Sequence, residues 1–119
     1  MATEIDLTNG VIRTTSSTNT IQALSQSVDV SRFDQLDLRL HIHGATGTIT
    51  DFVVAIISDM QMETEDGWPT LASFTSLTAV NGVVVLNVPR LFKYVRWKVT
   101  LLSGASAVAF SIRGMARQN

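Results

Sequence analysis

The sequence has no cysteine, few charges and no long apolar run. Without cysteine, the 119-residue chain has no disulfide, no thiolate metal ligand and no cysteine nucleophile. Charged residues make up 16% of the chain, against roughly 25% in ordinary soluble domains. The longest apolar run, residues 52–57, is far shorter than the roughly 20 residues that cross a bilayer. These absences exclude a disulfide scaffold and a membrane-spanning helix.

The balance of charge excludes two classes of partner. The formal net charge is -1, so the chain lacks the general attraction that nucleic acid or an anionic membrane requires. We expect neither as a partner. Residues 1–6 hold two acids and no basic residue, and no apolar stretch follows them, which is unlike a secretory signal. We therefore expect synthesis and folding in a cytoplasm.

What the chain does contain is apolar and uncharged polar residues. Hydrophobic residues reach 45%, the mean hydropathy is +0.24, and serine and threonine together supply 25 residues. A domain of this size buries only about two-thirds of its unfolded surface, so part of the apolar content should face a partner. We expect a homo-oligomer, or a chain that packs against other proteins.

A period of two dominates the sequence and predicts strands. In residues 36–43, apolar side chains alternate with Asp37, Arg39, His41 and His43. Residues 52–57 are apolar on both faces, and residues 94–101 alternate with Trp97 inward and Arg96 outward. Further strands are expected near residues 4–7, 21–30, 68–75, 77–80, 83–88 and 108–112.

Glycine-rich and polar segments predict where these strands end. Turns are expected at residues 44–47 and 103–106, a hairpin turn at Asn81-Gly82, and short helical turns near residues 31–35 and 90–93. The resulting fold class is all-β: a single-domain antiparallel β-sandwich of about eight strands, jelly-roll-like, over residues 1–119. Residues 1–20 are a candidate for an extended N-terminal arm.

Residues that could support chemistry are sparse. His41 and His43 could supply two zinc ligands, with Asp37 as a third, but polar residues on a wet or partner-facing surface are the favoured interpretation. The acidic group at residues 59–66 lacks EF-hand spacing and is interpreted as a solvated loop. No nucleophile elbow, P-loop or dinucleotide fingerprint is present. We expect no enzyme, no cofactor and no metal.

A basic stretch is interpreted in the same way. Arg90, Lys93, Arg96 and Lys98 lie near Tyr94 and Trp97, which could form a platform for single-stranded nucleic acid. Because Trp97 falls on the inward register, the favoured interpretation is contact with an acidic neighbouring subunit or simple solubility.

The second half of the chain carries a family resemblance. Ser58-Asp59, then Gly67-Trp68-Pro69-Thr70-Leu71-Ala72-Ser73-Phe74-Thr75, then residues 91–99 and 110–114, resemble small β-sandwich virion proteins of tailed bacteriophages. The match covers roughly residues 50–115. Lys93 stands where the pattern has arginine, and the loop before Gly67 is longer. Related patterns also occur in sugar-binding galactose-binding-like and discoidin-like sandwiches.

The resemblance implies a virion structural protein. The role it favours is a capsid decoration (cement) protein, which binds the major capsid protein or other virion proteins between capsid subunits and stabilises the head. It implies a place on the capsid surface after synthesis in the host cytoplasm, and self-association as a trimer. We expect Arg39, His41 and His43 to contact the partner.

Two other roles stay open from the sequence. One is a tail or head-fibre component. The other is a carbohydrate-binding module that stacks sugars on Trp68, Tyr94 or Phe92, although Trp68 beside Pro69 is more typical of a core plug at a strand edge.

Overall fold

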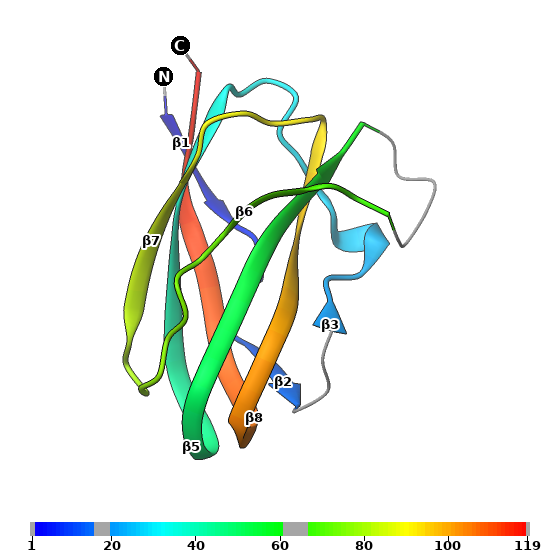
Figure 1. Cartoon of the computed structure of the whole chain (residues 1–119). Coiled ribbons are helices and arrows are strands. Elements are labelled where there is room, and N and C mark those ends of the chain that lie inside the picture. Colours follow the sequence, from blue (N-terminus) through cyan, green and yellow to red (C-terminus); the bar gives the residue numbers. More distant parts are fainter. Residues whose placement is uncertain (1, 16–19, 61–66, 119) are drawn as a thin grey trace.

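The computed structural model describes residues 2–15, 20–60 and 67–118, and the regular elements over these residues are strands and one short 3₁₀ turn (Figure 1). The elements, in chain order, are β1 Ala2–Asp6, β2 Ile12–Thr15, β3 Thr20–Ile21, η1 Leu24–Gln26, β4 Val28–Asp29, β5 Gln35–Asp59, β6 Thr70–Ser73, β7 Val83–Val88 and β8 Tyr94–Arg117.

Two very long strands, β5 and β8, form the frame of the molecule. They pair antiparallel along their length, from Gln35 opposite Arg117 to Asp59 opposite Tyr94. Both bend together near residues 47–51 and 103–105, at the lower end of Figure 1. Each strand therefore contributes one half to each of two layers, and the N- and C-termini lie together at the opposite end.

The shorter strands complete the two layers, so that the eight strands form one curled antiparallel sheet. Layer A consists of β7, residues 35–47 of β5, residues 105–117 of β8, and β1 with β2. Layer B consists of β6, residues 51–59 of β5, residues 94–103 of β8, and β3 with β4. The predicted all-β antiparallel sandwich is confirmed, and the jelly-roll path stays a prediction.

Two glycines allow β5 and β8 to bend where they pass from one layer to the other. Gly47 and Gly104 have φ values of 95° and 87°, in the left-handed region that other residues rarely adopt. A Cβ atom on Gly104 would lie 2.3 Å from the carbonyl oxygen of Thr48. Only glycine allows the two strands to approach this closely while they turn the corner.

The core fills the space between the layers. Leu36, Leu38, Leu40 and Ile42, from one face of β5, are fully buried, as the period-two pattern predicts. The ring of Phe110 in layer A lies 5.3 Å from the rings of both Phe52 and Trp97 in layer B, measured between centroids. These aromatic contacts join the layers across the core.

The structure corrects the predicted turns at residues 44–47 and 103–106. Neither ends a strand: β5 and β8 continue through both segments, with shifts of register instead of chain reversals. The glycines bend both long strands. The strands remain paired through the bend, because each bent segment has its partner on the other long strand.

Other boundaries are also corrected. The strand expected over residues 21–30 is broken into β3, η1 and β4, because the Gln22 side chain donates hydrogen bonds to the carbonyls of Leu7 and Gln26 and holds a local turn. Neither helical turn expected near residues 31–35 and 90–93 forms a helix: at the first, the Phe33 amide bonds the Val30 carbonyl at 2.9 Å in a single turn, and residues 90–93 have no regular secondary structure.

The predicted hairpin at Asn81-Gly82 is a turn but not a hairpin. Asn81 has a φ of 65°, and the Gly82 amide bonds the Ala79 carbonyl at 3.1 Å. The residues before it pair with β5 instead of β7: the Leu77 amide bonds the Phe52 carbonyl and the Asn81 amide bonds the Ile42 carbonyl. The segment therefore crosses from layer B to layer A along β5.

The segment considered as an arm lies partly within the described residues. Residues 2–6 and 12–15 pair with β8 of the same chain, whereas residues 16–19 lie outside the described part.

Candidate functional site

The three predicted contact residues come together on the outer face of layer A. Strand alternation on β5 turns Arg39, His41 and His43 away from the core, as their sequence pattern predicts. The register of β8 places Arg113 opposite Arg39 and Ser111 opposite His41. These residues therefore form one continuous cross-strand group.

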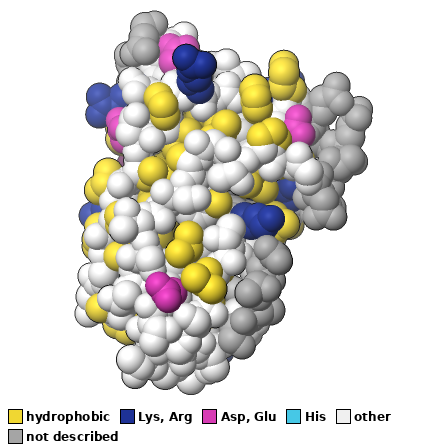
Figure 2. All heavy atoms as spheres, viewed as in Figure 1, with side chains coloured by type: hydrophobic (Ala, Val, Ile, Leu, Met, Phe, Trp, Pro, Cys, Tyr) yellow, Lys and Arg dark blue, Asp and Glu magenta, His cyan; other side chains and the backbone are white. Residues whose placement is uncertain are grey.

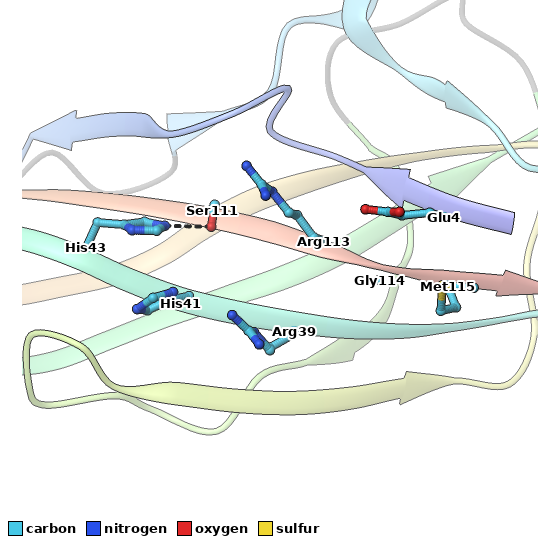
Figure 3. A pocket seen from close by; sticks show the side chains of 8 residues that line it. All are labelled: Glu4, Arg39, His41, His43, Ser111, Arg113, Gly114 and Met115. Carbon is cyan, nitrogen blue, oxygen red and sulfur yellow. Dashed lines mark hydrogen bonds between the residues drawn. The ribbon is translucent and has the colours of Figure 1, made fainter.

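A concavity of about 360 Å³ lies on this face (Figure 3). Its lining comes from β1, β5 and β8: Glu4, Arg39, His41, His43, Ser111, Arg113, Gly114 and Met115. In Figure 3 the Arg39 side chain extends toward His41, the Arg113 side chain extends to the β1 side of β8, and Glu4 lies toward the end opposite the histidines. Four of the eight lining residues can therefore carry positive charge, against one acid.

The two imidazoles are held close to each other. Their ring centroids are 4.2 Å apart, and His43 Nε2 shares a 2.8 Å hydrogen bond with Ser111 Oγ. Partial burial lowers the pKa of His41, and the neighbouring His43 and Arg39 lower it further. Burial and these neighbours thus disfavour protonation of His41.

Two arginines on this face form ion pairs with carboxylates. Arg113 Nε lies 3.4 Å from Asp6 Oδ2, and Arg117 pairs with Asp37. Within the described part of the chain Arg39 has no ion pair, and the residue opposite it on β8 is another arginine, Arg113. Like charges directly opposite each other on neighbouring strands repel.

The edge strand β7 borders this group and carries no charge. Its side chains Val83 and Val85 face outward with exposed fractions of 46% and 68%. They lie opposite His41 and Arg39 on β5. Within the described residues, β5 is the only strand that pairs with β7. Hence one edge of layer A is an unpaired, apolar strand edge.

Sequence reasoning missed this edge, although the sequence holds a signal for it. Residues 67–89 contain no charged side chain. Exposed edge strands usually carry charges, above all lysine, that block pairing with another chain. The absence of charge over this segment is therefore informative only once β7 is known to be an edge.

The structure does not assemble the metal sites considered from the sequence. Asp37, the third ligand considered beside the histidines, pairs with Arg117 and accepts a 2.8 Å hydrogen bond from Asn87 Nδ2. No cluster of three metal-ligating side chains occurs among residues 2–15, 20–60 and 67–118. Of the acidic loop, Asp59 is described, and Glu63, Glu65 and Asp66 lie outside the described residues.

Arg96 requires a correction. Its strand register turns it away from the main core, as predicted, but it is fully buried instead of facing a neighbour or solvent. Its guanidinium carbon lies 4.1 Å from the ring centroid of Trp68, and its Nη1 donates a 3.0 Å hydrogen bond to the Gln22 carbonyl. Trp68 thus covers the arginine by a cation–π contact.

The burial of Trp68 against Arg96 argues against sugar binding on this ring. Trp68 is only 6% exposed, as expected of a core plug, and its face packs on Arg96. It therefore offers no open ring surface for a sugar. Phe92 is exposed, and Tyr94 is half-buried with Lys93 Nζ 5.2 Å from its ring centroid.

The described part of the chain contains no helix with the length and hydropathy needed to cross a bilayer.

Comparison with known proteins gives similarity of fold. The sequence matches no family profile and no curated protein. Among solved structures, a chain of the disulfide-linked pili that form Bacillus endospore appendages superposes with a TM-score of 0.52 and 11% identity, covering 99% of this chain and 89% of that one. The SPBc2 prophage-derived protein YomS superposes with a TM-score of 0.47 and 13% identity, covering 98% and 92%. At 11% identity, the similarity to the pilus chain is one of fold.

Proposed function

We propose that this chain is a non-enzymatic structural subunit of a virion, a decoration protein that binds the major capsid protein and associates with copies of itself. The observation that carries the proposal is the outer face of layer A. It combines an uncharged, unpaired strand edge with a concavity lined by Arg39, His41 and His43. Both features suit an assembly.

The edge strand supports self-association. Pairing of β7 with a strand of a second copy would satisfy its open backbone groups and cover Val83 and Val85. Burial of each valine would contribute on the order of 1 kcal/mol. Because residues 83–88 carry no charge, an edge contact between copies brings no like charges together.

The composition and the fold support a place on the surface of a particle. Many copies on a lattice convert individually weak contacts into firm attachment, and a surface sparse in charge suits such close packing. Figure 2 shows one face on which uncharged side chains and backbone predominate and charges are scattered. The same fold occurs in a chain of assembled appendage pili.

Partner and location follow from the same proposal. The partners are the major capsid protein or other virion proteins, with nucleic acid and membranes disfavoured by the net charge of -1. The protein is made in the host cytoplasm and joins the capsid surface as a homo-oligomer, with the trimer as the expected state. A tail or head-fibre component would use the same face.

The test is addition of the purified protein to undecorated capsids of the phage that encodes it. We expect saturable binding and a rise in the melting temperature of the capsid. No binding to heads would overturn the decoration role, and binding to tails or fibres instead would establish the alternative.

Self-association is tested separately by sedimentation of the free protein. We expect Val85→Lys to weaken association at least about tenfold, because a lysine in the edge contact loses hydration. Val11→Lys, at another exposed position off β7, is the matched control. A wild type that stays monomeric at high concentration, or equal weakening by both variants, would refute the role of β7.

A further inference from the structure

We propose that the concavity between Arg39, His41, His43 and Arg113 is a binding site for an acidic side chain of the partner protein. This inference rests on the proposed docking function, and it names the chemistry of the contact. The ligand is a carboxylate, presented by an aspartate or glutamate on a protein surface.

The first argument is an excess of positive groups that the fold itself brings together. The cross-strand register places Arg39 directly opposite Arg113. Asp6 compensates Arg113 from β1, whereas no described carboxylate pairs with Arg39. The Asp6 carboxylate compensates Arg113 alone, so Arg39 still faces a like charge without an anion of its own. A carboxylate from a partner would supply that anion.

The second argument is the placement of the histidines beside these arginines. His41 and His43 lie on the same face of β5, with ring centroids 4.2 Å apart, and Ser111 orients His43 through its hydrogen bond. The Arg39 side chain extends toward the His41 ring in Figure 3. The donors therefore converge on one region, where a carboxylate oxygen could accept from an arginine and an imidazole together.

The third argument concerns the other charges that face the group. On β5 these are Asp37 and Arg39, on β8 Arg113 and Arg117, on β1 Glu4 and Asp6, and on β2 Arg13. Asp37 and Asp6 are engaged by Arg117 and Arg113, and β7 contributes only uncharged side chains. Glu4 is thus the one acid in the lining, and it lies toward the far end from the histidines.

A protein carboxylate fits better than a nucleic acid backbone. The concavity is bordered by Val83, Val85 and Met115, which suit an apolar protein surface around a single charged contact. A phosphate backbone would need a wider basic track than this, and the chain carries a net charge of -1.

Proton uptake should accompany binding. Partial burial lowers the pKa of His41 in the free protein, His43 and Arg39 lower it further, and a bound carboxylate would oppose the effect of these two neighbours. Binding should therefore tighten as the pH falls from about 7.5 to about 6, where glutamate remains ionised.

The experiment uses the full chain and a capped peptide of alternating glutamate and serine. Binding is followed at low salt through the NMR signals of the histidine rings, with the glutamine analogue of the peptide as the ligand control. We expect saturable shifts with the glutamate peptide, stronger at about pH 6. Arg39→Gln should weaken binding about fivefold, the effect of one partly exposed ion pair, and Arg90→Gln, at an exposed position outside the concavity, should not.

Several outcomes would overturn the inference. These are equal binding of the glutamine peptide, no binding of the glutamate peptide, equal effects of the two arginine variants, or tighter binding of a single-stranded oligonucleotide than of the peptide.

The capsid assay separates this inference from the proposed function. If Arg39→Gln binds capsids as well as the wild type, decoration stands and the carboxylate site is wrong. If the glutamate peptide binds specifically while capsids do not, the site stands and the decoration role is wrong.

Discussion

Substitution of Gly114 by alanine tests whether β5 and β8 approach as closely as the fold requires. A Cβ atom at position 114 would lie 1.9 Å from the carbonyl oxygen of Asp37 and 2.9 Å from the Cα of Leu38. Contacts of a Cβ atom below 3.0 Å essentially never occur, and these neighbours are backbone atoms that cannot rotate away. The two strands must therefore separate by about 1 Å.

The cost follows from where this separation occurs. Gly114 lies opposite Leu38 in the middle of the layer A ladder, between the buried residues Ile112 and Ala116. Overpacking a well-filled core costs about 1–3 kcal/mol, and weakened ladder hydrogen bonds add to it. We expect a loss of about 3 kcal/mol or more in the free energy of unfolding, which corresponds to a fall of roughly 10 °C in Tm.

Urea unfolding followed by tryptophan fluorescence measures this loss, because Trp68 and Trp97 are both buried. Gly44→Ala is the matched control: this glycine also lies on β5 in layer A, but nothing lies within 4 Å of its added Cβ. We expect the control to change stability by less than about 1 kcal/mol. Equal stability of the Gly114 variant and the wild type would refute the close approach of the two strands.

Two further predictions concern the buried arginine and the paired histidines. Trp68→Ala should lower the free energy of unfolding by about 2–4 kcal/mol, because it uncovers Arg96 and removes a buried ring; the exposed Val11→Ala should cost less than about 1 kcal/mol, and a similar loss in both would contradict the contact. Because the pKa of His41 is lowered in the folded state, the unfolded chain binds more protons below the ordinary value of 6.5, so stability should fall as the pH drops through that region. His41→Gln should reduce this fall in urea midpoints measured from about pH 7.5 to pH 5.5, and an unchanged fall would refute the role of His41.

The inner faces of the long strands could be predicted from the sequence. Leu36 to Ile42 and Val95 to Val99 alternate because each strand there faces the core on one side, and the outward placement of Arg39, His41 and His43 follows from the same period. Their grouping on one strand needs only local information.

The bends of β5 and β8, and the cross-strand neighbours of the outward-facing residues, could not be predicted in this way. Gly47 and Gly104 read locally as turn residues, but their paired strands bend together, which depends on a partner far away in the sequence. Arg113 and Ser111 join the histidines only through the register of β8. Arg96 has an outward register, and only the tertiary position of Trp68 explains its burial.

Electron cryo-microscopy of the particle, with this chain placed in the density, tests the central claim most directly. The claim predicts copies on the capsid shell with the outer face of layer A against a capsid protein, a capsid carboxylate beside Arg39, and β7 paired with a neighbouring strand. Heads without any such density, or copies that turn this face to solvent, would contradict it.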